Sequence, residues 1–346
     1  MKITITPENM LERIALWMNL APTPLVDTQA AFTAARAVMA ASNTGVFEAL
    51  GENSRTVKEA SAAAGTDPVA TKHLLDMLVS MNYVTHDQGR YTLRPKYRKW
   101  LLKSSPANLA GKMRFQITEW LWVAHMEEFV RTGKPLDFHQ KMNAQEWTDY
   151  QQGMRDLSIN TAKEFGGKLK LPAGATRMLD IGGSHGLYSI ELCRKNPALS
   201  STILELPGAV DEASAIAARE GMSDRVKHRS GNALTDDLGE ALYDLVVINN
   251  VVHHFTVPQN NELARRVHRA LKPGGLYGIG EFIRRDTPRT GDVIGAMGSL
   301  YFALTSASGT WSEAEIRGWQ KQAGFKTEKA MALMSLPGWK MVLARK

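Results

Sequence analysis

Two adjacent histidines, His253 and His254, lie near the end of the segment INNVVHHF and are the best-placed residues for proton chemistry. An apolar run from Leu245 to Ile248 precedes them. Such a run is typical of a buried parallel strand, and ligands bind beyond the carboxyl ends of such strands. A histidine there can take the proton of a hydroxyl group. Either His253 or His254 could therefore act as a general base, or finish the strand as a structural residue.

A glycine-rich loop follows a strand expected near 177–182, in the segment RMLDIGGSHG. Asp180 precedes Gly182, Gly183 and Gly186, and a helix follows. Glycines let a ligand lie against backbone amides at a helix N-terminus. The spacing differs from the G-x-G-x-x-G of dinucleotide enzymes, and an acid disfavours a pyrophosphate. The acid favours a cation such as S-adenosylmethionine, whose methyltransferases use the pattern acid-x-Gly-Gly-x-x-Gly.

Residues at the ends of the next two strands extend this predicted cofactor site. Glu205 ends the second strand, where a carboxylate can accept hydrogen bonds from both ribose hydroxyls. The turn 230–233 follows the third strand, where adenine is expected, and Asn232 offers both a donor and an acceptor. The predicted site for S-adenosylmethionine contains no metal and includes Asp180, Gly182, Gly183, Glu205, Leu206, Gly231, Asn232 and Ala233.

Aromatic and methionine side chains are candidates for the walls of an acceptor pocket. They suit a flat aromatic molecule, although such residues at helical spacing are as often core. Arg284 and Arg285 follow the fifth strand, where they could hold an acidic group or lie in solvent. The candidate wall residues are Trp120, Trp122, Tyr150, Met154, Met297 and Phe302.

Strands alternate with helices from Arg177 onward, which predicts a parallel sheet with crossover helices. KPGG (272–275) is interpreted as a turn before the fifth strand, and Leu169–Ala175 as the joint between a mainly helical domain (1–170) and an α/β domain (171–346). Strands are expected near 177–182, 201–206, 226–230, 243–251, 275–282, 328–334 and 339–345, and helices at 186–195, 208–220, 258–271 and 312–323.

The first half contains the pattern of a winged helix-turn-helix. A helix near 57–64 turns at Gly65 into a second helix, and two short strands follow, joined by 87–90. A DNA reader needs polar side chains on the second helix, but that helix offers only Lys72 and His73. Its apolar face favours a protein partner, so a DNA-binding regulator is the less favoured reading.

The bulk composition fits a two-domain globular enzyme. The chain has 346 residues, 44% hydrophobic and 22% charged, with a net charge of +7. One cysteine, Cys193, excludes an internal disulfide framework and favours a reducing cytoplasm. No apolar stretch approaches the ~18 residues of a membrane span, and the N-terminus is typical of an amphipathic helix.

Together these residues resemble the class I S-adenosylmethionine-dependent methyltransferases. More narrowly, roughly residues 25–346 resemble the plant caffeate-type O-methyltransferases and their bacterial small-molecule relatives. The resemblance implies an N-terminal winged-helix dimerisation domain, a Rossmann-like catalytic domain and a homodimer. It also implies methyl transfer to a small molecule, most readily a hydroxyl of an aromatic or acidic metabolite.

Family motifs add roles to individual residues. The segment YQQGMRDLS (150–158) matches F-N-x-G-M-x-D-H-S, so Met154 is expected to touch the substrate and Ser158 the methionine end of the cofactor. Val252–Phe255 corresponds to L-H-D-W, whose histidine is the general base, so the resemblance implies His253 as the base and His254 as a substrate contact or a structural residue. Trp122 falls at an aromatic pocket position.

The chain departs from the family pattern at several of these positions. His254 stands where the family has an acid, and Asn249 replaces a lysine near the cofactor. Glu281 occupies the position of a carboxylate that braces the catalytic histidine, whereas Thr310 stands at a second bracing position. S- or N-methylation and a non-methylating relative that binds the cofactor therefore stay open as alternatives.

Overall fold

The computed structural model describes residues 6–136, 138 and 142–346. It separates into two compact units, Lys2–Ile117 and Thr118–Lys346, and the boundary falls inside helix α8 (Ala110–Val123). The loop after residue 168, expected to join two domains, instead connects elements of the second unit. A division of function near residue 170 stays a prediction.

The first unit begins with helices that carry exposed apolar side chains. In α1 (Met10–Trp17), Met10, Leu11 and Trp17 are exposed, and the Asn9 side chain caps the helix by accepting from the amide of Glu12. The chain continues through α2 (Thr23–Leu25), the π-helix η1 (Val26–Ala30), α3 (Ala31–Asn43) and α4 (Val46–Leu50).

A helix-turn-helix and a β-hairpin follow, as predicted for a winged helix. Thr56 and Glu59 form a capping box that starts the first helix, and Gly65, with a φ of +66°, ends it. Leu75 and Leu78 of the second helix are fully buried in the core of this unit. The elements are β1 (Ser54–Arg55), α5 (Val57–Ala64), α6 (Pro68–Ser80), β2 (Val84–Asp87), β3 (Arg90–Leu93) and α7 (Pro95–Leu101).

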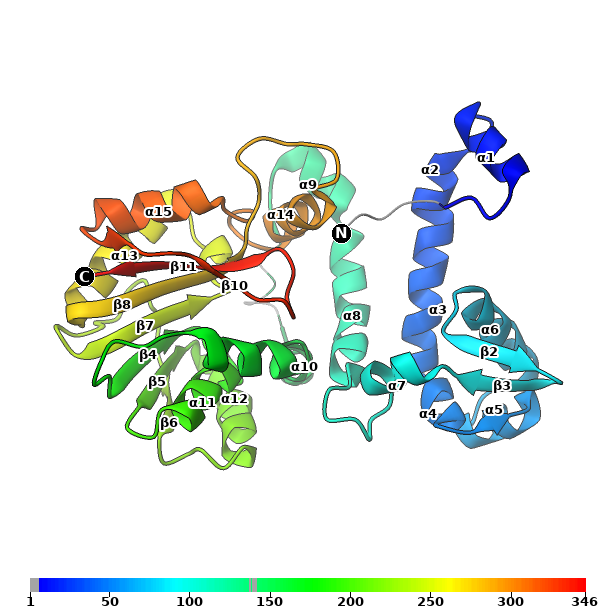
Figure 1. Ribbon diagram of the computed structural model, residues 1–346, viewed down its shortest axis with the longest axis horizontal. Helices are drawn as coiled ribbons and strands as arrows, with labels where there is room; N and C mark the ends of the chain where they lie inside the picture. The colour runs from blue at the N-terminus through cyan, green and yellow to red at the C-terminus, as the bar shows by residue number, and fades with distance from the viewer. Residues whose placement is uncertain (1–5, 137, 139–141) are drawn as a thin grey trace. The chain divides into compact units, whose positions relative to one another are not determined.

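The second unit is built on an eight-stranded mixed sheet (Figure 1). The order is β10-β11-β8-β7-β4-β5-β6, and β9 also pairs with β11. The pairs among β4–β8 are parallel, and the final strands are antiparallel. Bounds are β4 (Arg177–Ile181), β5 (Ser200–Glu205), β6 (Val226–Ser230), β7 (Tyr243–Asn249), β8 (Leu271–Phe282), β9 (Lys326–Thr327), β10 (Met331–Ala332) and β11 (Trp339–Arg345).

The alternation of side chains along the strands explains how helices cover both faces of the sheet. In β7, Leu245 and Val247 belong to a core that includes residues of α10–α12, whereas Val246 and Ile248 pack with α13 and α15. The Rossmann-like α/β class is thus confirmed. The helices are α9 (Met126–Thr132), α10 (Ala144–Lys168), α11 (Leu187–Lys195), α12 (Pro207–Arg219), α13 (Val257–Ala270), α14 (Val293–Thr305) and α15 (Glu313–Gln322).

Two features differ from the sequence-based expectations. α10 packs against α11 and α12, which is why residues 118–168 belong to the second unit. The KPGG segment lies inside β8, where the register to β7 shifts between Tyr243 and Leu245. Because β8 pairs with β7 on both sides of this irregularity, the turn residues there do not end the strand. In the part of the chain that is described, no helix is long and apolar enough to cross a membrane.

Candidate active site

A cavity of about 490 Å³ lies at the carboxyl ends of β4, β5 and β7 and is closed by α10. Its size lies within the usual range for small-molecule sites. It brings together most of the predicted cofactor residues and three of the predicted substrate residues. These are Ser158, Gly182, Gly183, Glu205, Leu206, Gly231, Asn232, Ala233 and Asn249, with Tyr150, Met154 and His254.

One face of α10 forms a wall that sequence reasoning found only in part. Trp147, Gln151, Met154 and Ser158 line the cavity at spacings of three or four residues. The side-chain oxygen of Gln151, which we did not predict, accepts a hydrogen bond from the Ser184 hydroxyl. Its signal was available, because Met154 and Ser158 already define this face of the helix.

The glycine loop is packed so tightly that side chains are excluded. Gly182 has a φ of +66°, and a Cβ there would lie 2.6 Å from Val251. A Cβ on Gly183 would lie 2.6 Å from the Asp180 carboxylate. Bare backbone at both positions therefore lines the cavity and allows close approach of a ligand.

Asp180 lies beneath this loop and is fully buried, outside the residues that line the cavity. Its Oδ2 accepts a hydrogen bond of 2.7 Å from Ser189 Oγ, which in turn accepts one of 2.8 Å from Ser201. Burial raises the pKa of Asp180 to about 7. The predicted direct contact with a cationic ligand is not what this geometry shows: the carboxyl supports the loop from below.

Asp180→Asn is expected to change how stability depends on pH. In the wild type, the folded state keeps a proton that the unfolded state loses between its ordinary pKa of 3.8 and about 7. The wild type therefore loses stability as pH rises through this window, and the amide does not. Relative to the wild type, the variant should gain on the order of 1–3 kcal/mol from pH 4 to 8. Denaturant unfolding at several pH values measures this, and a constant difference would contradict a raised pKa.

Glu205 is held at the end of β5 with its carboxylate in the cavity wall. Oε2 accepts from the amide of Ser184 at 3.0 Å, and Oε1 from that of Leu206 at 2.9 Å. Burial raises the pKa of Glu205. Two fixed oxygens with remaining lone pairs fit the two hydroxyls of a ribose.

Asn249 also lines the cavity, at the end of β7. Its side chain is 8% exposed, and both amide atoms lack a hydrogen-bond partner within the described ranges. Both atoms are buried away from the cavity, against Gly280, where an added Cβ would lie 2.4 Å from Asn249 Oδ1, so the amide does not test the fit of a ligand. The fixed carboxylate of Glu205 and the bare glycine backbone make the cavity fit S-adenosylmethionine.

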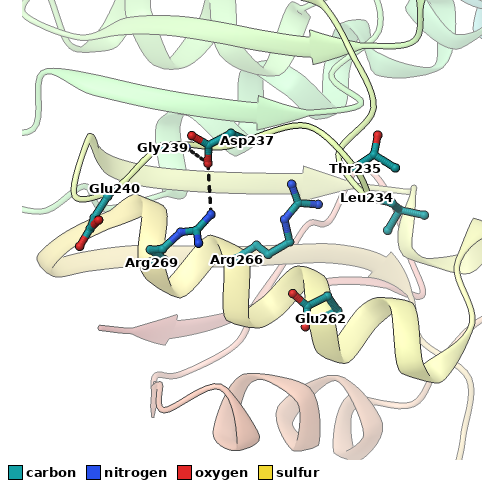
Figure 2. A pocket seen from close by; sticks show the side chains of 8 residues that line it. All are labelled: Leu234, Thr235, Asp237, Gly239, Glu240, Glu262, Arg266 and Arg269. Carbon is teal, nitrogen blue, oxygen red and sulfur yellow. Dashed lines mark hydrogen bonds and ion pairs between the residues drawn. The ribbon is translucent and has the colours of Figure 1, made fainter.

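The loop after β6 is held by α13. Arg266 donates to the carbonyl oxygens of Ala233, at 2.6 Å, and of Asp236. Figure 2 shows Arg266 beside Leu234 and Arg269 paired with Asp237, at 3.1 Å. This polar groove is occupied by its own ion pairs, and its effect is to fix Ala233 and Leu234, which line the cofactor cavity.

His253 forms a buried pair with Glu281. Its Nδ1 lies 2.8 Å from Glu281 Oε2, and both side chains are almost fully buried. Glu281 Oε1 accepts from the amide of Phe282 at 2.9 Å, and Phe302 stacks on the imidazole at 3.7 Å. Among described residues no hydrogen bond engages Nε2 of His253. A carboxylate on Nδ1 places the proton there and leaves a lone pair on Nε2.

His254, the adjacent residue, lines the cavity directly and continues into an aromatic cluster. Its ring lies 4.3 Å from His253 and 6.3 Å from Phe138. The ring of Phe138 is tilted against that of Trp122, with centroids 4.1 Å apart, and lies 6.4 Å from the ring of Tyr150. Phe138 was missed because a single phenylalanine outside any periodic pattern carries no signal.

Other candidates lie away from the cavity lining. Met297 is 57% exposed and Trp120 37% exposed, and neither lines the cavity. Nη2 of Arg284 donates to both carboxylate oxygens of Glu315, at 2.8 and 2.7 Å, so this side chain is already paired within the protein. Thr310 is buried, and its hydroxyl has no partner among the residues described.

Comparison with known proteins agrees with this geometry. The family model for the O-methyltransferase domain matches residues 122–326. The 3-hydroxy-5-methyl-1-naphthoate 3-O-methyltransferase of Streptomyces sahachiroi is 26% identical over 335 residues, 93% of this chain and 94% of that protein. The N,N-dimethyltransferase OxyT of Streptomyces rimosus is 25% identical over 334 residues, with 93% and 96% covered.

A solved structure shows the same fold over the whole chain. Human N-acetylserotonin methyltransferase in complex with S-adenosylmethionine superposes with a TM-score of 0.82 at 19% identity, covering 99% of both chains. The fold and the family match together define a Rossmann-like methyltransferase that uses S-adenosylmethionine and acts on a small molecule. The chain belongs to the O-methyltransferase family.

Proposed function

We propose that this methyltransferase acts on a hydroxyl group of an aromatic small molecule and that His253 is its general base. The observation that carries the proposal is the buried pair between His253 Nδ1 and Glu281, at 2.8 Å. It orients the ring and fixes its tautomer, as a carboxylate does for a catalytic histidine in other enzymes. The same arrangement gives Glu281 its proposed catalytic role.

The proposed roles follow from the charges that appear and disappear during methyl transfer. When bound, S-adenosylmethionine supplies an electrophilic methyl group on a positively charged sulfur. His253 Nε2 takes the proton of the acceptor hydroxyl, and Glu281 stabilises the imidazolium that results. Phe302 covers the ring face at 3.7 Å but leaves the ring edge, where a hydrogen bond to Nε2 forms. Proton removal makes the oxygen a better nucleophile.

We also propose roles for the residues that would bind the cofactor. Glu205 would hold the ribose, and Gly182 and Gly183 would give bare backbone to the amino-acid part. The loop Gly231–Ala233 would border adenine, and Asn249 would line the cofactor at the end of β7. Leu206 lines the cavity beside Glu205, and Ser158 lies at the opposite helix wall.

The aromatic cluster supports a flat acceptor. Trp122, Phe138, Tyr150 and His254 adjoin the cavity in one connected set of rings. Tyr150, Met154 and His254 line the cavity itself. The similarity to a 3-hydroxy-5-methyl-1-naphthoate 3-O-methyltransferase over 93% of this chain also supports an aromatic hydroxyl.

An amine acceptor is the second candidate. It is favoured by the similarity to an N,N-dimethyltransferase over 93% of this chain. Thr310 is neutral where the family places a second bracing acid, so His253 has one carboxylate partner rather than two. An amine that is already neutral needs less help from a base.

A homodimer through residues 1–170, in the cytoplasm, completes the proposal. The exposed apolar side chains of α1 and of the segment that follows it support a protein partner, since large apolar patches usually mark interaction surfaces. These exposed apolar residues include Met10, Leu11, Trp17, Leu20 and Leu25.

The test of the proposed function is an acceptor screen with methyl-labelled S-adenosylmethionine. Hydroxylated aromatic acids, matched amines and matched thiols are compared at equal concentration. The expected result is label in a methyl ether, with one S-adenosylhomocysteine formed for each ether. Label found only in amine products would favour the second candidate.

A further inference from the structure

His185 lies inside the glycine loop, at the position before Gly186, yet it points into the protein. It is 3% exposed and lines the cofactor cavity. Its Nδ1 accepts a hydrogen bond of 3.1 Å from the amide of Leu187. Its Nε2 lies 3.1 Å from the hydroxyl of Ser158 on α10. The ring therefore links the loop to the helix that closes the cavity.

The hydrogen bond from Leu187 decides which ring nitrogen carries the proton. A nitrogen that accepts from an amide has no hydrogen of its own, so in the neutral ring Nε2 is the donor. Burial, with the nearby Arg155 and His228, lowers the pKa of His185 to about 3, against the opposite effect of a hydrogen bond with the backbone of Met154. The ring is thus neutral at physiological pH, and Nε2 donates to Ser158 Oγ.

This fixes the direction of the Ser158 hydroxyl. Because Oγ accepts from His185, the hydrogen of Ser158 must point to another acceptor. The Tyr188 hydroxyl is close, and it lies 3.0 Å from Thr161 Oγ1. Ser158 and Tyr188 both line the cavity. A charged oxygen in the cavity is a stronger acceptor than a phenol oxygen.

The charged and titratable groups around His185 bear on its protonation state. Arg155, one turn before Ser158 on α10, is close enough to His185 to lower its pKa. It pairs with Glu220 at 3.1 Å. The Nε2 of His228 lies 2.8 Å from the carbonyl oxygen of Ser184, and burial lowers the pKa of His228, so this ring is also neutral. Arg155 is thus the cation that affects His185.

We propose that His185 is a positioning residue that directs the Ser158 hydroxyl, as a donor, toward the carboxylate of the cofactor's amino-acid part. The proposal rests on the assignment of this cavity to S-adenosylmethionine. It assigns a role to a residue in the glycine loop of this chain, because a side chain without an N–H there would leave the rotation of the Ser158 hydroxyl unrestrained.

Ligand binding tests the proposal without turnover. Calorimetry compares S-adenosylhomocysteine with its decarboxylated analogue, which lacks only the carboxylate. His185→Ala should weaken binding of S-adenosylhomocysteine about 10-fold, the scale of one charge-assisted hydrogen bond, and leave the analogue within about twofold. Ser158→Ala should show the same selective loss, and the double variant should add little to either.

Two further variants separate positioning from folding. His185→Gln keeps an N–H donor near the position of Nε2 and should recover most of the affinity. His268→Gln, on α13, is the matched control and should bind both ligands as the wild type does. Because His185 is neutral, the affinity ratio of the two ligands should stay constant from pH 6 to 9.

Several results would overturn the proposed role of His185, each for a different reason. Equal loss of both ligands in His185→Ala would reduce His185 to a structural part of the loop. No loss, or a ratio that titrates near pH ~6.5, would also overturn the positioning role. If the wild-type protein bound neither ligand, the assignment of the cavity itself would fail, and His185 would have no carboxylate to serve.

Discussion

His253→Ala is expected to lower turnover by about 10²-fold or more, the usual scale for a lost general base, while cofactor affinity changes less than about twofold. The reason is position: Nε2 has no other partner among described residues, Nδ1 is held by Glu281, and neither atom lines the cofactor cavity. Single-turnover kinetics at saturating cofactor measure the chemical step directly.

The neighbouring histidine gives the matched control. His254 lines the cavity, so His254→Ala should raise the KM for the acceptor more than it lowers kcat. Glu281→Gln keeps the size of the brace but removes its charge, and should cause a smaller loss than His253→Ala. If His253→Ala turned over normally and His254→Ala did not, the two roles would have to be exchanged.

Glu205→Ala is expected to weaken binding of S-adenosylhomocysteine by about 100-fold, because two hydrogen bonds to a charged carboxylate are lost. Burial raises the pKa of Glu205, so a mildly acid pH should weaken wild-type binding before an ordinary carboxylate would protonate. Glu205→Ala should show no such loss of affinity at mildly acid pH. Calorimetry across pH measures both effects.

Glu240→Ala is the control for the removal of one acidic charge. Glu240 is exposed and lines the separate groove in Figure 2, not the cofactor cavity. Removal of the Glu240 carboxylate should leave the affinity for S-adenosylhomocysteine unchanged. Similar losses in Glu205→Ala and Glu240→Ala would point to long-range electrostatics rather than to a contact with ribose.

Much of the fold could be predicted because its signals are local. The apolar run of β7 and the glycines at 182 and 183 report strand and loop directly, and each strand of the parallel core begins or ends within a few residues of its expected bounds. The membership of α10 could not be predicted, because it depends on packing against α11 and α12.

The orientation of Asp180 shows how local reasoning fell short. The acid beside the loop was expected to meet a cation, but strand alternation places it on the same face as Met178, under α11. Its partner is therefore Ser189, and the glycine backbone lines the cavity instead. The links of Ser184 to Gln151 and of His185 to Ser158 join segments more than 25 residues apart, so no sequence spacing reveals them.

The proposed reaction is methyl transfer to a hydroxyl with His253 as the base. It is tested most directly by single-turnover reactions with carbon-13 methyl-labelled cofactor and an acceptor found in the screen, run with wild type and His253→Ala. The account predicts a labelled methoxy carbon, one S-adenosylhomocysteine per product, and a rate at least about 10²-fold lower in the variant. A label on nitrogen, sulfur or carbon, or an unchanged rate in the variant, would contradict it.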